Sequence, residues 1–246
     1  ENEYNIDNFL TLFDIEHLSK KTQTQAKTIF MKHHEAFSLH KYDIGCTDLI
    51  EMPVKLNSNM AKMQKYIPIP HNMREKAKEI LDQMLKHGII RECPESSQYC
   101  SNILVIKKKD KDSIRLLFDG RLLNYDTIRE PMAMISKPEI LAHLVNITHL
   151  TSLDFSDAFF HIPLAKEAQP LTAFYSHTHR LRMCFTRCPQ GLKNSPLYLK
   201  LLLDKIFKDM TETVLFYADD LLIATNGTIS QHLKIVEKVL ERIKEA

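Results

Sequence analysis

Two neighbouring aspartates, Asp219 and Asp220, stand between the apolar runs 214–217 and 221–224, and a third, Asp154, lies in a similar setting earlier in the chain. Burying such groups is costly without a compensating partner. Two carboxylates about 4 Å apart repel each other by roughly 4 kcal/mol at an effective dielectric constant of about 20. Salt bridges or a solvent-exposed turn would explain the pattern. A divalent cation would explain it equally well, because Mg²⁺ takes carboxylate oxygens alongside substrate phosphates.

The composition is that of an ordinary soluble globular chain, with 246 residues, 44% of them hydrophobic and 26% charged. A net charge of +2 gives no argument for a nucleic-acid partner. The apolar runs are short and interrupted by charge, so we expect no membrane span and no signal peptide. Five cysteines favour a reducing, intracellular setting over a disulfide scaffold. A first residue other than methionine suggests a piece of a longer protein.

The elements that must position the aspartates alternate between apolar strands and amphipathic helices, which predicts an α+β fold. Turn residues such as Asn226 and Gly227 mark where strands end. The pattern predicts strands at 101–106, 114–118 and 150–155, a hairpin over 171–186, two short strands within 214–224, helices at 73–87, 197–210 and 231–246, and a mostly helical segment at 1–40.

Several segments resemble the motifs of reverse transcriptases, most closely those of retroviruses and gypsy-class LTR retrotransposons. These segments follow one another along the chain in the order that the family shows. Segment 217–220, Tyr-Ala-Asp-Asp, resembles the tyrosine-x-Asp-Asp motif, and 153–160 is similar to the first catalytic motif. Segment 187–196 resembles the Pro-Gln-Gly loop, and 106–124 is similar to the basic fingers hairpin. The resemblance covers about residues 27–246.

The resemblance implies the fingers and palm of a right-hand polymerase, with an antiparallel palm sheet backed by helices. It places an N-terminal helical extension at 1–50, the fingers at 51–128 and 162–190, and the palm at 129–161 and 191–246. The family's primer grip, thumb and RNase H domain would follow downstream in the same polyprotein. Residues 1–246 alone are therefore expected to be only weakly active.

The implied activity is template-directed DNA synthesis, in which two Mg²⁺ or Mn²⁺ ions assist transfer of a deoxynucleotide to a primer 3′-hydroxyl with release of pyrophosphate. Asp154 and Asp219 would ligate both ions, helped by the backbone carbonyl of Phe155. Asp220 would add a third carboxylate to the site, with weaker or indirect contact to the ions. These carboxylates are the implied catalytic residues.

The incoming deoxynucleotide would be bound by both charged and backbone groups. Lys108 and Arg115 would grip its triphosphate, one as a point charge and the other as a planar fork. Backbone N–H groups of Asp157 and Ala158 would add donors. Without the resemblance, the lysine-rich run 107–111 would be read as a solvated loop.

The sugar of the nucleotide would be checked by two further residues. Phe159 would be the steric gate that excludes a ribose 2′-hydroxyl, and Gln190 would contact the sugar end, with Gly191 allowing close backbone approach. Taken singly, Phe159 and Phe160 would be core residues and Gln190 a turn residue. Only their joint order with the other motifs favours the functional interpretation.

The implied partners are an RNA or DNA template with its primer, deoxynucleotides, and the downstream thumb and RNase H domains, in the cytoplasm or a virus-like particle and with no membrane. Two alternatives remain open. A viral RNA-dependent RNA polymerase shares the palm, although Phe159 argues against it. A decayed or domesticated retroelement fragment could act as a nucleic-acid- or protein-binding module.

Some residues depart from the family pattern or suggest other chemistry. Gly120 stands where an aromatic or bulky residue is usual, which predicts looser packing against the template base, and Cys188 replaces a larger apolar residue. His177, His179 and Cys184, together with Cys188, suggest zinc, but their spacing matches no common zinc module.

Overall fold

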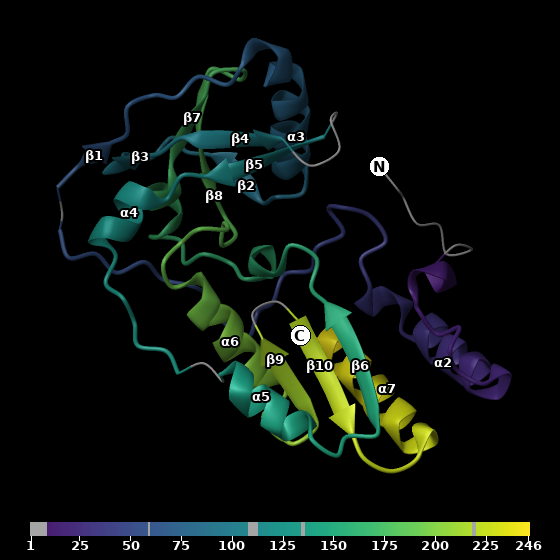
Figure 1. Ribbon diagram of the computed structural model, residues 1–246. Helices are drawn as coiled ribbons and strands as arrows, with labels where there is room; N and C mark the ends of the chain where they lie inside the picture. The colour runs from purple at the N-terminus through teal and green to yellow at the C-terminus, as the bar shows by residue number, and fades with distance from the viewer. Residues whose placement is uncertain (1–8, 59, 108–112, 134–135, 218–219) are drawn as a thin grey trace. The chain divides into compact units, whose positions relative to one another are not determined.

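The computed structural model describes residues 9–58, 60–107, 113–133, 136–217 and 220–246. These residues form two compact units, each built from separate stretches of the chain (Figure 1). Unit 1 comprises Glu1–Ile44, Met132–Ala158 and Lys200–Ala246, and unit 2 comprises Gly45–Pro131 and Phe159–Leu199. Two of the four boundaries fall within helical elements, η4 (Ala158–His161) and α6 (Ser195–Ile206), and the other two fall in connecting segments.

Unit 1 is built around an antiparallel sheet of three strands in the order β6-β10-β9. The central strand β10 (Asp220–Thr225) pairs with β6 (His149–Asp154) and with β9 (Val214–Tyr217). Alternation decides which face of β10 is buried: Leu221 and Ile223 are fully buried, whereas Asp220 is exposed. The predicted strands at 150–155 and within 214–224 are thereby confirmed.

Helix α7 (Ile229–Glu245) covers one face of this sheet and contacts β10 and β6 (Figure 1). It begins with a capping box, in which Thr228 and Gln231 exchange side-chain to backbone hydrogen bonds and so satisfy donors that the first turn leaves unpaired. Its apolar residues recur at helical spacing and are buried: Leu233, Val236, Val239 and Leu240. The helix predicted at 231–246 is confirmed, beginning two residues earlier.

The N-terminal segment of unit 1 packs on α7. Helix α2 (Lys20–Lys32) lies between the 3₁₀ turns η1 (Leu10–Leu12) and η2 (His34–Ala36) and contacts α7. Four phenylalanine rings cluster there, with neighbouring centroids from 4.1 to 6.1 Å apart, in Phe9, Phe13, Phe30 and Phe37. Within the part of 1–40 that is described, α-helix covers α2 and Phe9 and leaves other segments non-helical, which is less helix than the sequence predicts.

Unit 2 contains small sheets and helices. Strands β2 (Ile90–Glu92), β8 (Leu181–Phe185) and β7 (Phe174–Ser176) form one antiparallel sheet. The hairpin of β4 (Ile103–Lys107) and β5 (Ile114–Phe118) forms another.

A short parallel pair in unit 2, β1 (Lys62–Met63) with β3 (Tyr99–Cys100), lies beside a buried carboxylate. Asp126 accepts hydrogen bonds from Lys62 Nζ at 2.6 Å and Tyr99 Oη at 2.7 Å. The Lys62 hydrogen bond and then the Tyr99 hydrogen bond lower the pKa of Asp126. Burial and the same contact raise the pKa of Tyr99 to about 12. Asp126 therefore remains ionised inside unit 2.

Two of the remaining helices agree with the sequence prediction. Helix α3 (Arg74–Lys86) confirms the prediction at 73–87, and Gly88 follows it with φ 65°, a conformation that glycine adopts without strain. The helix predicted at 197–210 is α6, which ends at Ile206. Helices α4 (Arg121–Asp126) and α5 (Lys137–Leu144) were not predicted, because each is short.

Within the described residues, no helix is both long and apolar enough to cross a bilayer.

A buried histidine ties α7 to two strands of the unit 1 sheet. His232 Nε2 lies 2.8 Å from Thr151 Oγ1 on β6, and Nδ1 lies 2.7 Å from Thr225 Oγ1 on β10. Burial, and then the nearby His149 ring, lower the pKa of His232 from its ordinary 6.5 to about 4. The imidazole is therefore neutral at physiological pH.

This burial makes stability depend on pH. Because the unfolded-state pKa of His232 is 6.5 and the folded-state pKa is about 4, the unfolded chain binds the proton more tightly. The contribution of neutral His232 to the stability of the folded state is complete above pH 6.5 and is lost as pH falls toward 4. Between neutral pH and about pH 4.5, the free energy of unfolding should fall by about 2–3 kcal/mol more in the wild type than in His232→Gln.

Urea unfolding at both pH values measures this difference, and His71→Gln serves as a control at an exposed histidine. Equal pH dependence in the wild type and His232→Gln would show that His232 does not titrate on unfolding.

Candidate active site

The sheet of unit 1 brings two of the predicted catalytic carboxylates to one place. Asp154 is the last residue of β6, Asp220 is the first of β10, and the register sets them directly opposite each other. Residues so paired in an antiparallel sheet point to the same face, with Cβ atoms about 4.5–5.5 Å apart. Asp219 lies outside the described residues, although it immediately precedes Asp220 in the sequence.

Both carboxylates are exposed, so neither bears the cost of burial that an apolar setting would impose. The apolar neighbours belong to the opposite face: Leu221 is buried, and Thr151 on β6 bonds to His232 of α7. Asp154 and Asp220 thus lie on the face of the sheet away from α7. Opposed carboxylates open to solvent are hard oxygen donors that leave room for substrate phosphates, a donor set that fits Mg²⁺ or Mn²⁺.

The chain turns sharply just after Asp154. Phe155 is half-buried, and Asp157 has φ 47°, in the left-handed region that aspartate tolerates better than most residues. The 3₁₀ turn η4 then begins at the buried Ala158. Strained backbone of this kind costs about 1–3 kcal/mol and clusters at functional sites. Asp157 and Ala158 thus follow the last residue of β6, Asp154, by only three and four residues, and the chain turns between them.

The two phenylalanines that follow, both in unit 2, differ in their surroundings. The Phe160 ring stacks on Phe185, with centroids 6.3 Å apart and planes 14° from parallel. The Phe160 carbonyl accepts a hydrogen bond from Arg187 Nη1 at 3.1 Å. Phe159 is half-buried. Phe160 therefore has a packing role in unit 2, which leaves Phe159 as the candidate for contact with substrate.

Gln190 lies on a loop of unit 2 that is hydrogen-bonded to α4. Asn124 Nδ2 donates to the Gly191 carbonyl at 2.5 Å, and Asn124 Oδ1 accepts from the Lys193 N–H at 2.8 Å. Lys193 Nζ also donates to the Thr127 carbonyl at 2.6 Å. Gly191 has φ 99°, so a side chain there would be strained. Gln190 itself is half-buried.

Gly120 lies close to this loop, where the sequence predicted loosened packing. A Cβ atom at Gly120 would stand 3.3 Å from the Gly191 carbonyl oxygen and 3.2 Å from a ring carbon of Phe118. The structure therefore shows close backbone approach at Gly120 rather than open space. The sequence did not reveal that Asn124 and Lys193 position the loop. Both stand inside the motif segments, but sequence spacing does not indicate long-range pairing.

One of the two side chains predicted to bind the triphosphate, Arg115, lies on the β4–β5 hairpin of unit 2. Arg115 is exposed on β5 and pairs in register with Ile106 on β4. Lys107, also exposed, is the last residue of β4. Lys108 lies outside the described residues.

The histidines and cysteines that suggested zinc have separate surroundings within unit 2. His177 lies against two tyrosine rings, and His179 Nε2 contacts Asp82 Oδ1 at 2.8 Å. Cys184 is buried, and Cys188 Sγ lies 2.8 Å from Ser195 Oγ.

A different grouping of possible metal ligands occurs in unit 1. His33, Glu237 and Glu241 bring ligand atoms within 4.8 Å of one another. Lys32 Nζ lies 2.7 Å from Glu237 Oε1, and this hydrogen bond is the main cause of the lowered pKa of Glu237. An ion pair between α2 and α7 therefore accounts for the cluster.

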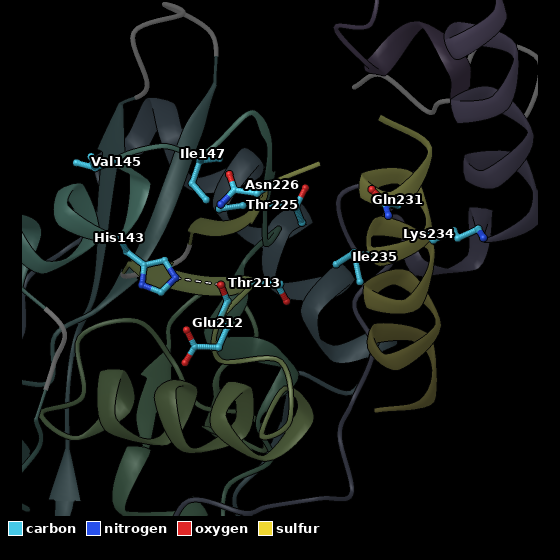
Figure 2. Close-up of a pocket in the computed structure, with 11 residues that line it drawn as sticks. His143, Val145, Ile147, Glu212, Thr213, Thr225, Asn226, Gln231, Lys234 and Ile235 are labelled. Atoms are coloured by element: carbon cyan, nitrogen blue, oxygen red, sulfur yellow. Dashed lines mark hydrogen bonds between the residues drawn. The ribbon is translucent and has the colours of Figure 1, made fainter. Parts of the chain in front are cut away.

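A cavity of about 670 Å³ lies at the end of the unit 1 sheet away from the carboxylates (Figure 2). Thr213 precedes the first residue of β9 and Thr225 ends β10, so this cavity and Asp220 are at opposite ends of the same strands. His143 Nε2 donates to the Glu212 carbonyl at 3.0 Å along its wall (Figure 2). The cavity is thus distinct from the carboxylate site.

Comparison with known proteins links this arrangement to a family. The chain is 29% identical over 202 residues to the retrovirus-related Pol polyprotein from transposon opus of Drosophila melanogaster, covering 80% of this chain and 20% of that protein. It is 26% identical over 245 residues to the corresponding polyprotein from transposon gypsy of the same species, covering 97% and 23%. The chain therefore spans about a fifth of the length of these relatives.

The fold matches a solved structure of the foamy viral protease-reverse transcriptase in complex with an RNA/DNA hybrid, with a TM-score of 0.84 and 22% identity. The match covers 98% of this chain and 32% of that one. The predicted α+β fold of polymerase fingers and palm, with an antiparallel palm sheet backed by a helix, is confirmed. The family model described as reverse transcriptase (RNA-dependent DNA polymerase) matches residues 106–246. Because this match spans more than half of the sequence, the chain belongs to the reverse transcriptase family.

Proposed function

We propose that this chain supplies the nucleotidyl-transfer centre of a reverse transcriptase, which extends a primer 3′-hydroxyl by one deoxynucleotide at a time and releases pyrophosphate. The observation that carries the proposal is the register of β6 and β10, which pairs Asp154 with Asp220 on the open face of the sheet. In a member of this family, such a pair beside Asp219 in sequence is suited to metal-assisted transfer of a nucleotidyl group from a triphosphate to a hydroxyl group.

Asp154, Asp219 and Asp220, with the backbone carbonyl of Phe155, are the proposed ligands for two Mg²⁺ or Mn²⁺ ions. Bound there, the ions lower the pKa of the primer hydroxyl and neutralise the departing pyrophosphate. Exposure of Asp154 and Asp220 supports the assignment, because both keep their oxygens accessible without the desolvation cost of a buried carboxylate.

The other proposed contacts are with the deoxynucleotide. Lys108 and Arg115 bind the triphosphate, and Arg115 is exposed on β5 as this role requires. Backbone N–H groups of Asp157 and Ala158 also bind phosphate oxygens. The positive φ of Asp157 supports this, because such turns can aim successive N–H groups at an anion.

Selection of the sugar is assigned to Phe159 and Gln190. Phe159 occupies the volume that a 2′-hydroxyl needs, and Gln190 contacts the sugar end of the nucleotide. The hydrogen bonds from Asn124 support the second role, because they hold the loop carrying Gln190 in a defined position.

We assign the fingers to 51–128 and 162–190, the palm to 129–161 and 191–246, and an N-terminal extension to 1–50. The separation of unit 2 from unit 1 supports the division between fingers and palm, whereas residues 1–44 belong to the same compact unit as most of the palm. The proposed partners are an RNA or DNA template with its primer, and thumb and RNase H domains of the same polyprotein. The structural relative solved with an RNA/DNA hybrid supports the template and primer as partners. The proposed setting is the cytoplasm or a virus-like particle.

The metal assignment predicts that Asp219→Asn lowers the rate of primer extension by about a thousandfold, the order of loss expected when several kcal/mol of metal-assisted stabilisation are removed. Mn²⁺ titration in the presence of template-primer and deoxynucleotide should show weakened binding in the same variant. Asp204→Asn is the matched control, because Asp204 is a partly exposed aspartate of α6 paired with Lys200. Equal metal binding by the wild type and Asp219→Asn would show that the site is misassigned.

The gate assignment predicts that Phe159→Val raises incorporation of ribonucleotides relative to deoxynucleotides, because the smaller side chain leaves space for a 2′-hydroxyl. The ratio of the two kcat/KM values in the complete polymerase measures this, independently of total rate. Phe160→Val is the neighbouring control: it should lower stability, because Phe160 stacks on Phe185, and leave the ratio unchanged. An unchanged ratio in Phe159→Val would remove Phe159 from the gate.

A further inference from the structure

Arg187 of unit 2 precedes Gln190 on the same loop, and its side chain contacts the segment that carries Phe159. Its Nη1 donates to the Phe160 carbonyl at 3.1 Å and to the Gly45 carbonyl at 2.7 Å. Hydrogen bonds from a charged donor are about twice as strong as those between neutral groups. A single nitrogen of Arg187 therefore joins the Gln190 loop to two other segments of the unit.

The backbone around Arg187 is paired with the chain that follows Phe160. Arg187 forms an isolated antiparallel bridge with Pro163. Beside this bridge, the Cys188 N–H donates to the Ile162 carbonyl at 2.9 Å. These contacts fix the register of the two segments, so the Arg187 side chain is held beside the Phe160 carbonyl.

The segment that contains Gly45 is anchored to the same turn. The Thr47 N–H donates to the His161 carbonyl at 2.9 Å. The Gly45 and Phe160 carbonyls thus converge on Arg187 from positions far apart in the sequence. Without the guanidinium, two carbonyl oxygens would lie near each other with a hydrogen bond lost from each, and the segments would move apart to restore bonding.

The backbone of Phe159 is held on both sides of the peptide that follows it. The Ile162 N–H donates to the Phe159 carbonyl at 3.1 Å, and the next carbonyl, that of Phe160, accepts from Arg187. The Phe160 ring in turn stacks on Phe185. The position from which the half-buried Phe159 side chain extends therefore depends in part on Arg187.

We propose that Arg187 is a positioning residue for sugar selection, because its guanidinium fixes the Phe159 ring relative to the Gln190 loop. Residues that shape a functional site must be held within about 0.5 Å of the productive geometry. The inference rests on the proposed function, in which Phe159 excludes the ribose 2′-hydroxyl. Arg187 acts through Phe159 and has no contact of its own with the nucleotide in this assignment.

The test measures kcat/KM for ribonucleotides relative to deoxynucleotides in the complete polymerase. Arg187→Met keeps an apolar stem but loses the donor, so the Phe159 ring recedes and the ratio should rise by about tenfold, as for a change of one methylene in a pocket. Arg187→Lys keeps a charged donor that ends one bond short of Nη1, so its ratio should lie between those of the wild type and Arg187→Met. A lower total rate with an unchanged ratio in Arg187→Met would overturn the proposal.

Arg182 provides a matched control for the loss of an arginine that braces the backbone. It lies on β8 of the same unit, and its Nε donates to the Cys93 carbonyl at 3.0 Å. Arg182→Met should lower the urea midpoint of unfolding, as Arg187→Met does, and leave the sugar ratio unchanged. An equal rise in the ratio in both variants would show general loosening of the unit and would also overturn the proposal.

A second variant is available if Arg187→Met does not fold. Arg187→Gln keeps a polar side chain in this half-buried position, but its amide nitrogen ends two bonds short of Nη1. It should therefore raise the sugar ratio as Arg187→Met would, and an unchanged ratio in the folded Arg187→Gln variant would reject the positioning role.

A double-mutant cycle separates action through Phe159 from direct action on the nucleotide. In a Phe159→Val background, Arg187→Met should change the ratio less than about twofold, because the ring that Arg187 positions is gone. A further tenfold rise in that background would show that Arg187 acts independently of Phe159, which contradicts the proposal.

Failure of the proposed gate gives a different result. If Phe159→Val leaves the ratio unchanged, the gate assignment is wrong, and the role of Arg187 is rejected with it. If Phe159→Val raises the ratio and Arg187→Met does not, the gate assignment stands and the positioning role of Arg187 alone is rejected.

Discussion

The antiparallel pairing of β6 with β10 determines where the acidic side chains of unit 1 lie, and the remaining elements of that unit maintain this register. Asp154 opposes Asp220 only in the observed alignment. A slip of one residue would turn the carboxylates to opposite faces and expose the fully buried Leu221 and Ile223. Burial against α7 therefore supplies the free energy that resists the slip, and the bonds from His232 to both strands add a second restraint.

Periodic elements of the fold could be predicted from sequence, because burial on one face leaves a regular pattern. Strand β10 and helix α7 are clear cases. The short helix α5 was missed, although its capping box of Ser136 and Glu139 is a readable signal. The Asn124 hydrogen bonds could not be predicted, because the residues they join are distant in sequence and neither spacing nor composition indicates the pairing.

For the candidate site, the sequence indicated which residue types are involved but not how each residue is placed. The residue types and their order singled out the carboxylates, but the sequence left open whether they are buried, and the structure shows Asp154 and Asp220 exposed at strand ends. Apolar neighbours in a strand report on the opposite face as much as on the residue itself. The surroundings of Gly120 could not be predicted for a related reason, since only the fold shows that a carbonyl from a distant loop approaches it.

The attachment of the Gln190 loop to α4 has a mechanical consequence. Asn124 both donates to the loop and accepts from it, and the two segments approach so closely at Gly120 that a side chain there would be crowded. Helix α4 begins three residues after the end of β5, so a short covalent link and the Asn124 hydrogen bonds connect the β4–β5 hairpin to the Gln190 loop. We therefore expect a displacement of the hairpin to move Arg115 and Gln190 together.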